Sequence, residues 1–221
     1  DSRAVFKNVN VDMRQFKKLR MFLHAESIES NTDGNRLQDD EMVAFIRFGN
    51  DFTDNFYQVE MPLKVTPHGA STPEEVWPSE NEIELPLDLL TKLKILSLQN
   101  DPIIIVEPNG IGYVEEEAIG SSDNRLTLGI KGNPNFGLVR TLMIGVKNAK
   151  TGAIETESIR GEVWFNELRM SDMDNKGGYA AVANLDTNFA DFANVSATTR
   201  VSTIGFGALE QGPNERSRED V

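Results

Sequence analysis

The side chains that most often carry out chemistry in proteins are scarce in this chain. It has two histidines, His24 and His68, and no cysteine. A helical zinc site needs two histidines four residues apart, and the sequence has no such pair. The lack of cysteine excludes thiolate nucleophiles, thiolate metal ligands and disulfides. His24 lies in an apolar run that predicts a packed histidine, and His68 follows a proline in a predicted turn.

Carboxylates are plentiful, with runs at residues 39–41 and 115–117. A glycosidase needs two of them facing each other across a cleft, one held protonated by burial. Adjacent carboxylates on a loop are usually solvated instead. The sequence has neither a Gly-x-Ser-x-Gly elbow nor a glycine-rich phosphate-binding loop. We therefore expect a protein that is not an enzyme.

Calcium is the metal ion for which the sequence offers candidate ligands. Calcium prefers carboxylate and carbonyl oxygens, and jelly-roll domains often hold a structural calcium ion. Asp51, Asp54 and Asn55 lie close together between two predicted strands. The segment lacks the Asp-x-Asp-x-Asp-Gly order of well-defined calcium loops. A structural calcium ion at these residues is a hypothesis, and no other cofactor is predicted.

Aromatic side chains suggest a different kind of binding, because their flat apolar faces can pack against sugar rings. Aromatic residues make up 8% of the chain, and most of them are expected in the core. Trp77 is the exception, since it lies between prolines in a predicted connection. It is the candidate residue for stacking against a glycan.

Composition limits the classes of partner. The net charge of −13 and the pI near 4.6 argue against nucleic acid, whose phosphates require clustered Lys and Arg, and against an anionic membrane surface. Hydrophobic residues make up 39% of the chain, which predicts a globular protein. No run of about 20 apolar residues occurs, so no transmembrane helix is predicted. The first residues enter a strand pattern almost at once, as expected for a fragment of a longer chain.

The body of the chain reads as short strands separated by turns. Pro108-Asn109-Gly110 lies between two apolar runs and predicts a hairpin, because Asn-Gly readily adopts positive φ. Leucines at helical spacing in residues 86–99 predict one short amphipathic helix that covers its own core. The fold class expected is all-β, a jelly-roll-like antiparallel β-sandwich. The predicted strands are 5–13, 19–28, 42–48, 56–65, 103–106, 111–115, 126–130, 138–147 and 161–170.

The last part of the chain alternates at strand period. Residues 179–190 and 193–202 each place small or apolar side chains on one face and polar ones on the other, which predicts a β-hairpin. Strands of about 9 to 11 residues with this pattern resemble those of outer-membrane barrels, but a surface hairpin alternates in the same way. We expect a sandwich domain over 1–175, followed by this hairpin and a tail over 176–221.

Several motifs, taken together and in order, resemble the SprA/Sov family of gliding-motility and secretion proteins. The resemblance covers nearly the whole chain. The motifs lie at 45–57, 75–78, 132–134, 141–148, 166–169, 190–195, 205–207 and 214–219.

The resemblance implies an internal segment of a very large outer-membrane channel of the type IX secretion system. It would be a structural and interaction domain, placed in the periplasm or at the cell surface outside the bilayer, except for its C-terminal strands. Its implied partners are the remainder of its own chain, accessory outer-membrane and plug subunits, and secreted cargo proteins. The alternative from a different class is a glycan-binding jelly-roll module of a cell-surface protein.

Overall fold

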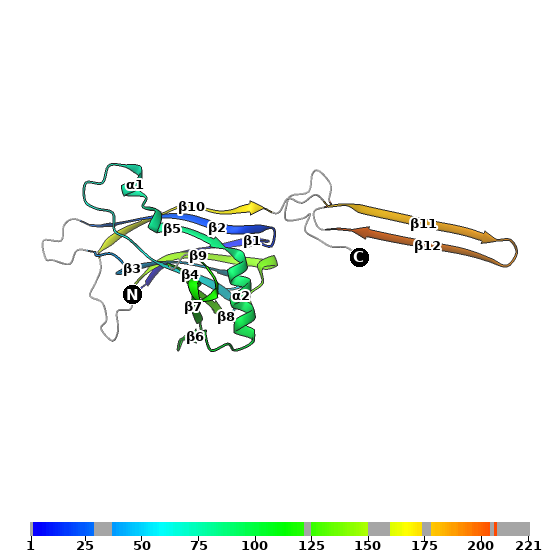
Figure 1. Ribbon diagram of the computed structural model, residues 1–221, viewed down its shortest axis with the longest axis horizontal. Coiled ribbons are helices and arrows are strands. Elements are labelled where there is room, and N and C mark those ends of the chain that lie inside the picture. The colour runs from blue at the N-terminus through cyan, green and yellow to red at the C-terminus, as the bar shows by residue number, and fades with distance from the viewer. Residues whose placement is uncertain are drawn as a thin grey trace. The chain divides into compact units, whose positions relative to one another are not determined.

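The computed structural model describes residues 2–28, 37–121, 125–149, 160–173, 178–203 and 206. The chain divides into two compact units, Asp1–Asp172 and Met173–Val221, and each is described by itself. The first unit is an antiparallel β-sandwich with one longer helix, and the second contains a β-hairpin (Figure 1). The predicted all-β, antiparallel fold class is therefore confirmed. The motif at 214–219 lies outside the described residues.

The larger sheet of the first unit has seven strands. β3 is paired antiparallel with both β9 and β4 and lies near the middle of the sheet. Its alternate side chains Ala44, Ile46 and Phe48 are buried in the core. Across the sheet the order is β1 (Ser2–Val11), β9 (Val139–Asn148), β3 (Met42–Gly49), β4 (Phe56–Pro62), β8 (Thr127–Lys131), β7 (Gly112–Glu115) and β6 (Ile105–Val106).

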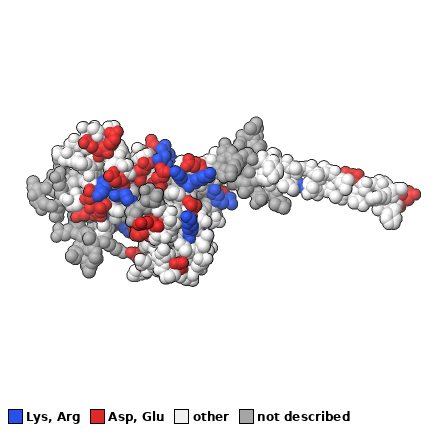
Figure 2. Space-filling view, in the orientation of Figure 1, with Lys and Arg blue, Asp and Glu red and all other residues white. Residues whose placement is uncertain are grey.

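The smaller sheet has three strands, in the order β10 (Gly161–Met173), β2 (Phe16–Ser27) and β5 (Glu82–Pro86). Leu19, Met21 and Leu23 of β2 are buried in the same core cluster as the side chains of β3. The opposite face of β2, which carries the alternate residues, is partly exposed at Lys18 and Arg20. There Lys18 and Arg20 form ion pairs with glutamates of β5, and Figure 2 shows the mixed charges on this unit.

Helix α2 (Leu87–Leu98) confirms the predicted amphipathic helix. Pro86 is its N-cap residue rather than its first helical residue. Leu87, Leu89, Leu90 and Leu93 are buried, and the helix packs against β8 and β2. Among the described residues, no helix is long and apolar enough to span a membrane. The shorter helices are α1 (Pro73–Val76), η1 (Ser79–Asn81), η2 (Glu116–Ile119) and η3 (Phe136–Leu138).

The second unit contains the predicted hairpin, formed by β11 (Ala180–Phe189) and β12 (Ala193–Ser202). The strands pair in continuous register from Ala180 opposite Ser202 to Phe189 opposite Ala193. Residues that face each other across the pair share a face of the hairpin. One face is therefore largely apolar and the other largely polar. The apolar face carries Ala181, Ala183, Leu185, Thr187, Phe189, Ala193, Val195, Ala197, Thr199 and Val201.

Candidate functional site

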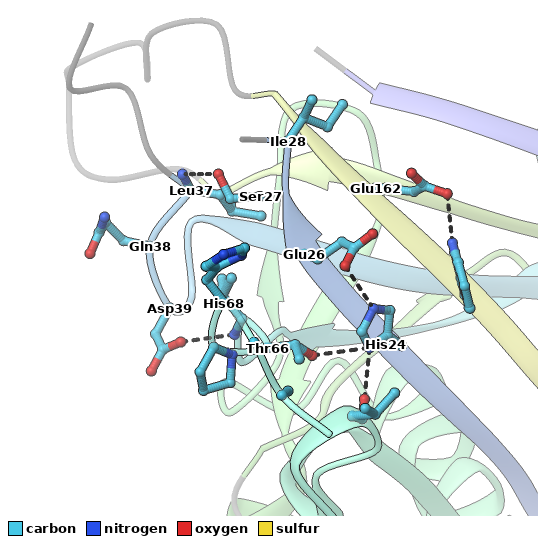
Figure 3. A pocket seen from close by; sticks show the side chains of 16 residues that line it. His24, Glu26, Ser27, Ile28, Leu37, Gln38, Asp39, Thr66, His68 and Glu162 are labelled. Atoms are coloured by element: carbon cyan, nitrogen blue, oxygen red, sulfur yellow. Dashed lines mark hydrogen bonds and ion pairs between the residues drawn. The ribbon is translucent and has the colours of Figure 1, made fainter. Parts of the chain in front are cut away.

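A pocket of about 1140 Å³ lies where β2 ends and β10 begins (Figure 3). Its walls are formed by two strands, by residues 37–39 and by the segment that follows β4. β2 contributes His24 and Glu26, and β10 contributes Glu162 and Trp164. The members of each pair are two positions apart, so both project from the same, outer face of the smaller sheet. Strand geometry therefore presents four polar or aromatic side chains together.

Contacts between β2 and β10 show the direction and register in which the two strands pair. The His24 ring lies 5.2 Å from the ring of Trp164 between centroids, and further along the sheet Lys18 approaches Asp172 at 3.8 Å. Residue numbers thus fall along β2 as they rise along β10, which is antiparallel pairing. Two positions before Trp164, Glu162 therefore lies beside Glu26.

His24 is buried, as expected for a packed histidine, with 3% of its surface exposed. Its Nδ1 lies 2.7 Å from the backbone oxygen of Val76 and 3.0 Å from Oγ1 of Thr66. Its Nε2 lies 3.5 Å from Oε2 of Glu26. The Val76 oxygen can only accept, so Nδ1 carries a proton and donates to it. Nε2 is therefore the ring nitrogen that faces Glu26.

The two tryptophans lie against His24 in different ways. Trp164 lines the pocket, is 49% exposed, and donates its indole N–H to Oε1 of Glu162 at 2.7 Å. Trp77 is half-buried, with its ring centroid 5.7 Å from that of His24. Trp77 therefore packs a connecting segment against β2. Glycan stacking at Trp77 stays a prediction, to be tested by oligosaccharide titration of Trp77→Ala.

The described residues that line the pocket make it acidic. Its described lining contains Glu26, Glu162 and Asp39 but neither Lys nor Arg. Asp39 accepts a hydrogen bond from the backbone N–H of Val65, which, with the Lys64 ammonium at 3.1 Å, holds its pKa below the usual value. The charge of Asp39 is thus already matched. The other two carboxylates meet His24 and the Trp164 indole.

The three calcium candidates lie together in the loop between β3 and β4. Oδ1 of Asp51 accepts hydrogen bonds from the backbone N–H groups of Thr53, Asp54 and Asn55, and Oδ2 accepts one from the Asn55 side chain. N–H donors surround the carboxylate, whereas a calcium site presents several oxygens to one point. Among the described residues, no group of three or more His, Cys, Asp or Glu could hold a metal ion. This geometry favours a structural role for Asp51.

The same loop joins two motifs of the family resemblance. Asn55 accepts a hydrogen bond from the N–H of Asn133, and Asn50 accepts one from the N–H of Asn135. The Asn50 amide also donates to the backbone oxygen of Leu138. Side-chain amides thus fasten the β3–β4 loop to residues 133–138, which explains structurally why asparagines occupy these positions.

The hydrogen bonds to Asp51 predict a pH dependence of stability. The N–H of Asp54, followed by the Asn55 side chain, holds the Asp51 pKa well below its usual value. A carboxyl group with a lowered pKa in the folded state contributes stability above its unfolded pKa of about 3.9, and the contribution is lost as the pH falls through the folded pKa. We expect Asp51→Asn to be less stable than wild type at neutral pH and the difference to shrink below about pH 4. Thermal unfolding at a series of pH values measures this, and a constant difference contradicts it.

Metal removal gives a separate test of the loop. Because Asp51 is already satisfied by N–H donors, we expect the same melting temperature in excess EDTA and in millimolar calcium. Differential scanning calorimetry is the measurement. A rise of several degrees in calcium that is absent from Asp51→Asn would restore the calcium hypothesis.

Sequence reasoning found parts of this site and missed others. It assigned His24 to packing and His68 to a turn, where both lie. It chose Trp77 rather than Trp164, because an aromatic residue in the middle of a strand is normally assigned to the core. Alternation with Glu162 was the signal for an outward-facing Trp164. The expectation of solvated carboxylates fails at Glu116, which is 1% exposed and accepts hydrogen bonds from two backbone N–H groups.

These observations define an antiparallel β-sandwich protein with a separate amphipathic hairpin. A family model, SprA_N, described as motility related/secretion protein, matches residues 1–221. The chain therefore belongs to this family of motility- and secretion-related proteins. None of the curated proteins matches the sequence significantly.

Proposed function

We propose that this chain is a structural and interaction domain of a very large outer-membrane channel that exports proteins in type IX secretion and gliding motility. Its membership of a motility- and secretion-related family supports the proposal. The observation that carries it is the hairpin of β11 and β12. No catalytic role is assigned to any residue.

The hairpin exposes its apolar side chains. Leu185 is 60% exposed, Phe189 57% and Val195 45%, although all three belong to one face. An apolar face of this kind favours contact with lipid or with other polypeptide. Each strand is ten residues long, which suits a tilted crossing of the hydrocarbon layer. In the described hairpin the charged residues are Asp186, Asp191 and Arg200 (Figure 2).

In the intact protein, the hairpin would join neighbouring strands of the channel wall, and the sandwich would lie outside the bilayer in the periplasm or at the cell surface. The partners proposed are the remainder of the same chain, accessory outer-membrane and plug subunits, and secreted cargo. The polar face of the hairpin, with Asn184, Ser196 and Thr198, suits the wet interior of such a channel.

The two faces supply a matched pair of variants in the intact protein. Leu185→Arg places a charge on the apolar face, and Asn184→Arg places the same charge one residue away on the polar face. We expect Leu185→Arg to block membrane assembly and cargo export, because arginine is costly on a lipid-facing surface, and Asn184→Arg to retain both. Outer-membrane fractionation and cargo secretion are the measurements. Normal export by Leu185→Arg would rule the proposal out.

A further inference from the structure

The pocket on the smaller sheet is lined by two glutamates from paired strands. Glu26 and Glu162 occupy neighbouring positions on β2 and β10, and a Cβ built on Gly161 would lie 3.2 Å from the backbone oxygen of Glu26. Like charges at adjacent cross-strand positions repel and destabilise a sheet. A cation held between them would remove this cost.

The side chains in contact with these two carboxylates leave the position of a cation between them to a ligand. Glu162 accepts the indole N–H of Trp164, and Glu26 lies against the Nε2 of His24. The Trp164 indole is uncharged, so its hydrogen bond leaves the negative charge of Glu162 in place. The side chain of Glu26 is 45% exposed toward solvent. The described lining holds these two glutamates, His24 and His68 but no Lys or Arg, and the charge of its third carboxylate, Asp39, is matched by Lys64.

Trp164 adds an aromatic wall to this acidic pocket. Its indole is fixed at one edge by Glu162 and on one side by His24, so little conformational freedom remains to be lost on binding. Nearly half of its surface is exposed. Tryptophan is the side chain that attracts a cation most strongly through its ring face. Two carboxylates beside a fixed indole thus match a group that is both cationic and flat.

We propose that this pocket binds the arginine side chain of an extended polypeptide segment, with its guanidinium at Glu26 and Glu162 and against Trp164. A guanidinium is planar, stacks on aromatic rings and donates to two carboxylates at once, whereas an ammonium acts as a point charge. The pocket, at about 1140 Å³, is larger than one side chain and leaves room for the neighbouring backbone of the segment. The inference rests on the pocket alone and does not depend on the channel proposal.

Calorimetric titration of the 221-residue chain with a short blocked peptide, acetyl-Gly-Arg-Gly-amide, tests this. The matched peptide carries citrulline, which keeps the shape of arginine but has no charge. We expect saturable binding of the arginine peptide, binding at least about tenfold weaker for citrulline, and weakening as salt is raised. A lysine peptide should bind less tightly than arginine.

Variants locate the binding. Glu26→Gln combined with Glu162→Gln keeps the side-chain volumes and is expected to weaken binding about tenfold or more, as is Trp164→Leu. Glu74→Gln makes a single charge change outside the pocket lining and should leave binding unchanged. Trp164 packs on His24, so Trp164→Leu could unfold the domain. In that case the double glutamine variant is the deciding test. The proposal is overturned if the arginine peptide does not bind up to about 10 mM, or if the citrulline peptide binds equally well. Full binding of the arginine peptide by the double glutamine variant also overturns it. So does saturable binding of a neutral oligosaccharide at Trp164 instead.

Discussion

Replacing Gly132 with alanine is expected to lower the free energy of unfolding by about 3 kcal/mol or more. Gly132 has φ +63°, in the left-handed region, and a Cβ there would lie 2.1 Å from the backbone oxygen of Asp54. That oxygen belongs to the loop that Asp51 and Asn55 hold by hydrogen bonds, so it cannot easily move away. Urea denaturation of wild type and variant measures the loss.

Gly69 provides the matched control for this prediction. It has φ +82°, but nothing lies within 4 Å of a Cβ built on it. Gly69→Ala therefore carries only the conformational cost of a positive φ, about 1 kcal/mol. The difference between the variants isolates the contact with the Asp54 oxygen. Equal losses at Gly132 and Gly69 would mean that the β3–β4 loop gives way, against the rigidity inferred from its hydrogen bonds.

The sequence predicts most clearly those elements whose side chains alternate without interruption. Both strands of the hairpin over 180–202 follow from such alternation, and α2 follows from its leucine spacing. Strand β5 was missed, although Glu82-Ile83-Glu84-Leu85 alternates and Ile83 and Leu85 are buried. It is short and leads directly into the helix at Pro86. A stretch of sequence long enough to show a pattern therefore also includes the helical leucines, which indicate a helix.

Strand β10 shows why faces are harder to predict than elements. Val163 and Phe165 pack against the core, and so do Leu168 and Met170, although strict alternation would put the two pairs on opposite faces. Glu167 has φ +53°, and this irregularity shifts the alternation by one residue. No local composition marks such a bulge. The bulge forms because it lets Leu168 and Met170 pack against the core.

The candidate pocket depends on contacts between distant segments. His24 and Trp164 are 140 positions apart in the printed sequence, and only the pairing of β2 with β10 brings them together. The residue types at the site were visible, but neither the strand order nor the register of β2 against β10 follows from periodicity. The motifs at 45–57 and 132–134 also belong to one loop cluster, which their spacing does not reveal.

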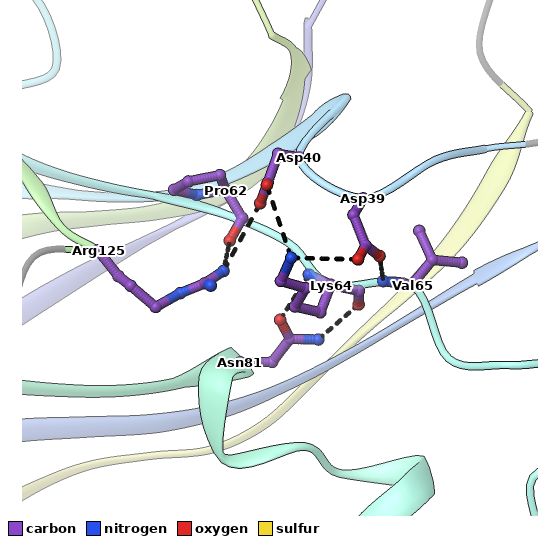
Figure 4. Close-up of polar contacts among 7 residues, drawn as sticks. All are labelled: Asp39, Asp40, Pro62, Lys64, Val65, Asn81 and Arg125. Carbon is purple, nitrogen blue, oxygen red and sulfur yellow. Dashed lines mark hydrogen bonds and ion pairs between the residues drawn. The ribbon is translucent and has the colours of Figure 1, made fainter.

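Asn81→Ala is expected to cost about 2 kcal/mol of stability, because it leaves two partly buried backbone groups of Lys64 without partners. The side chain of Asn81 is completely buried and takes the place of a neighbouring strand for Lys64 (Figure 4). Its Oδ1 accepts from the Lys64 N–H at 2.8 Å, and its Nδ2 donates to the Lys64 oxygen at 2.8 Å. No other common side chain of this length offers a donor and an acceptor together.

Two measurements separate this role from a general loss of packing. Chemical denaturation gives the free energy, with Asn10→Ala, at an exposed asparagine of β1, as a control expected to change it by less than about 0.5 kcal/mol. Hydrogen exchange reports the Lys64 backbone amide directly. In Asn81→Ala, this amide should exchange faster than the neighbouring amides of β4. An unchanged exchange rate at Lys64 would show that water or another group replaces Asn81, and the stabilising role assigned to this amide pair would then be wrong.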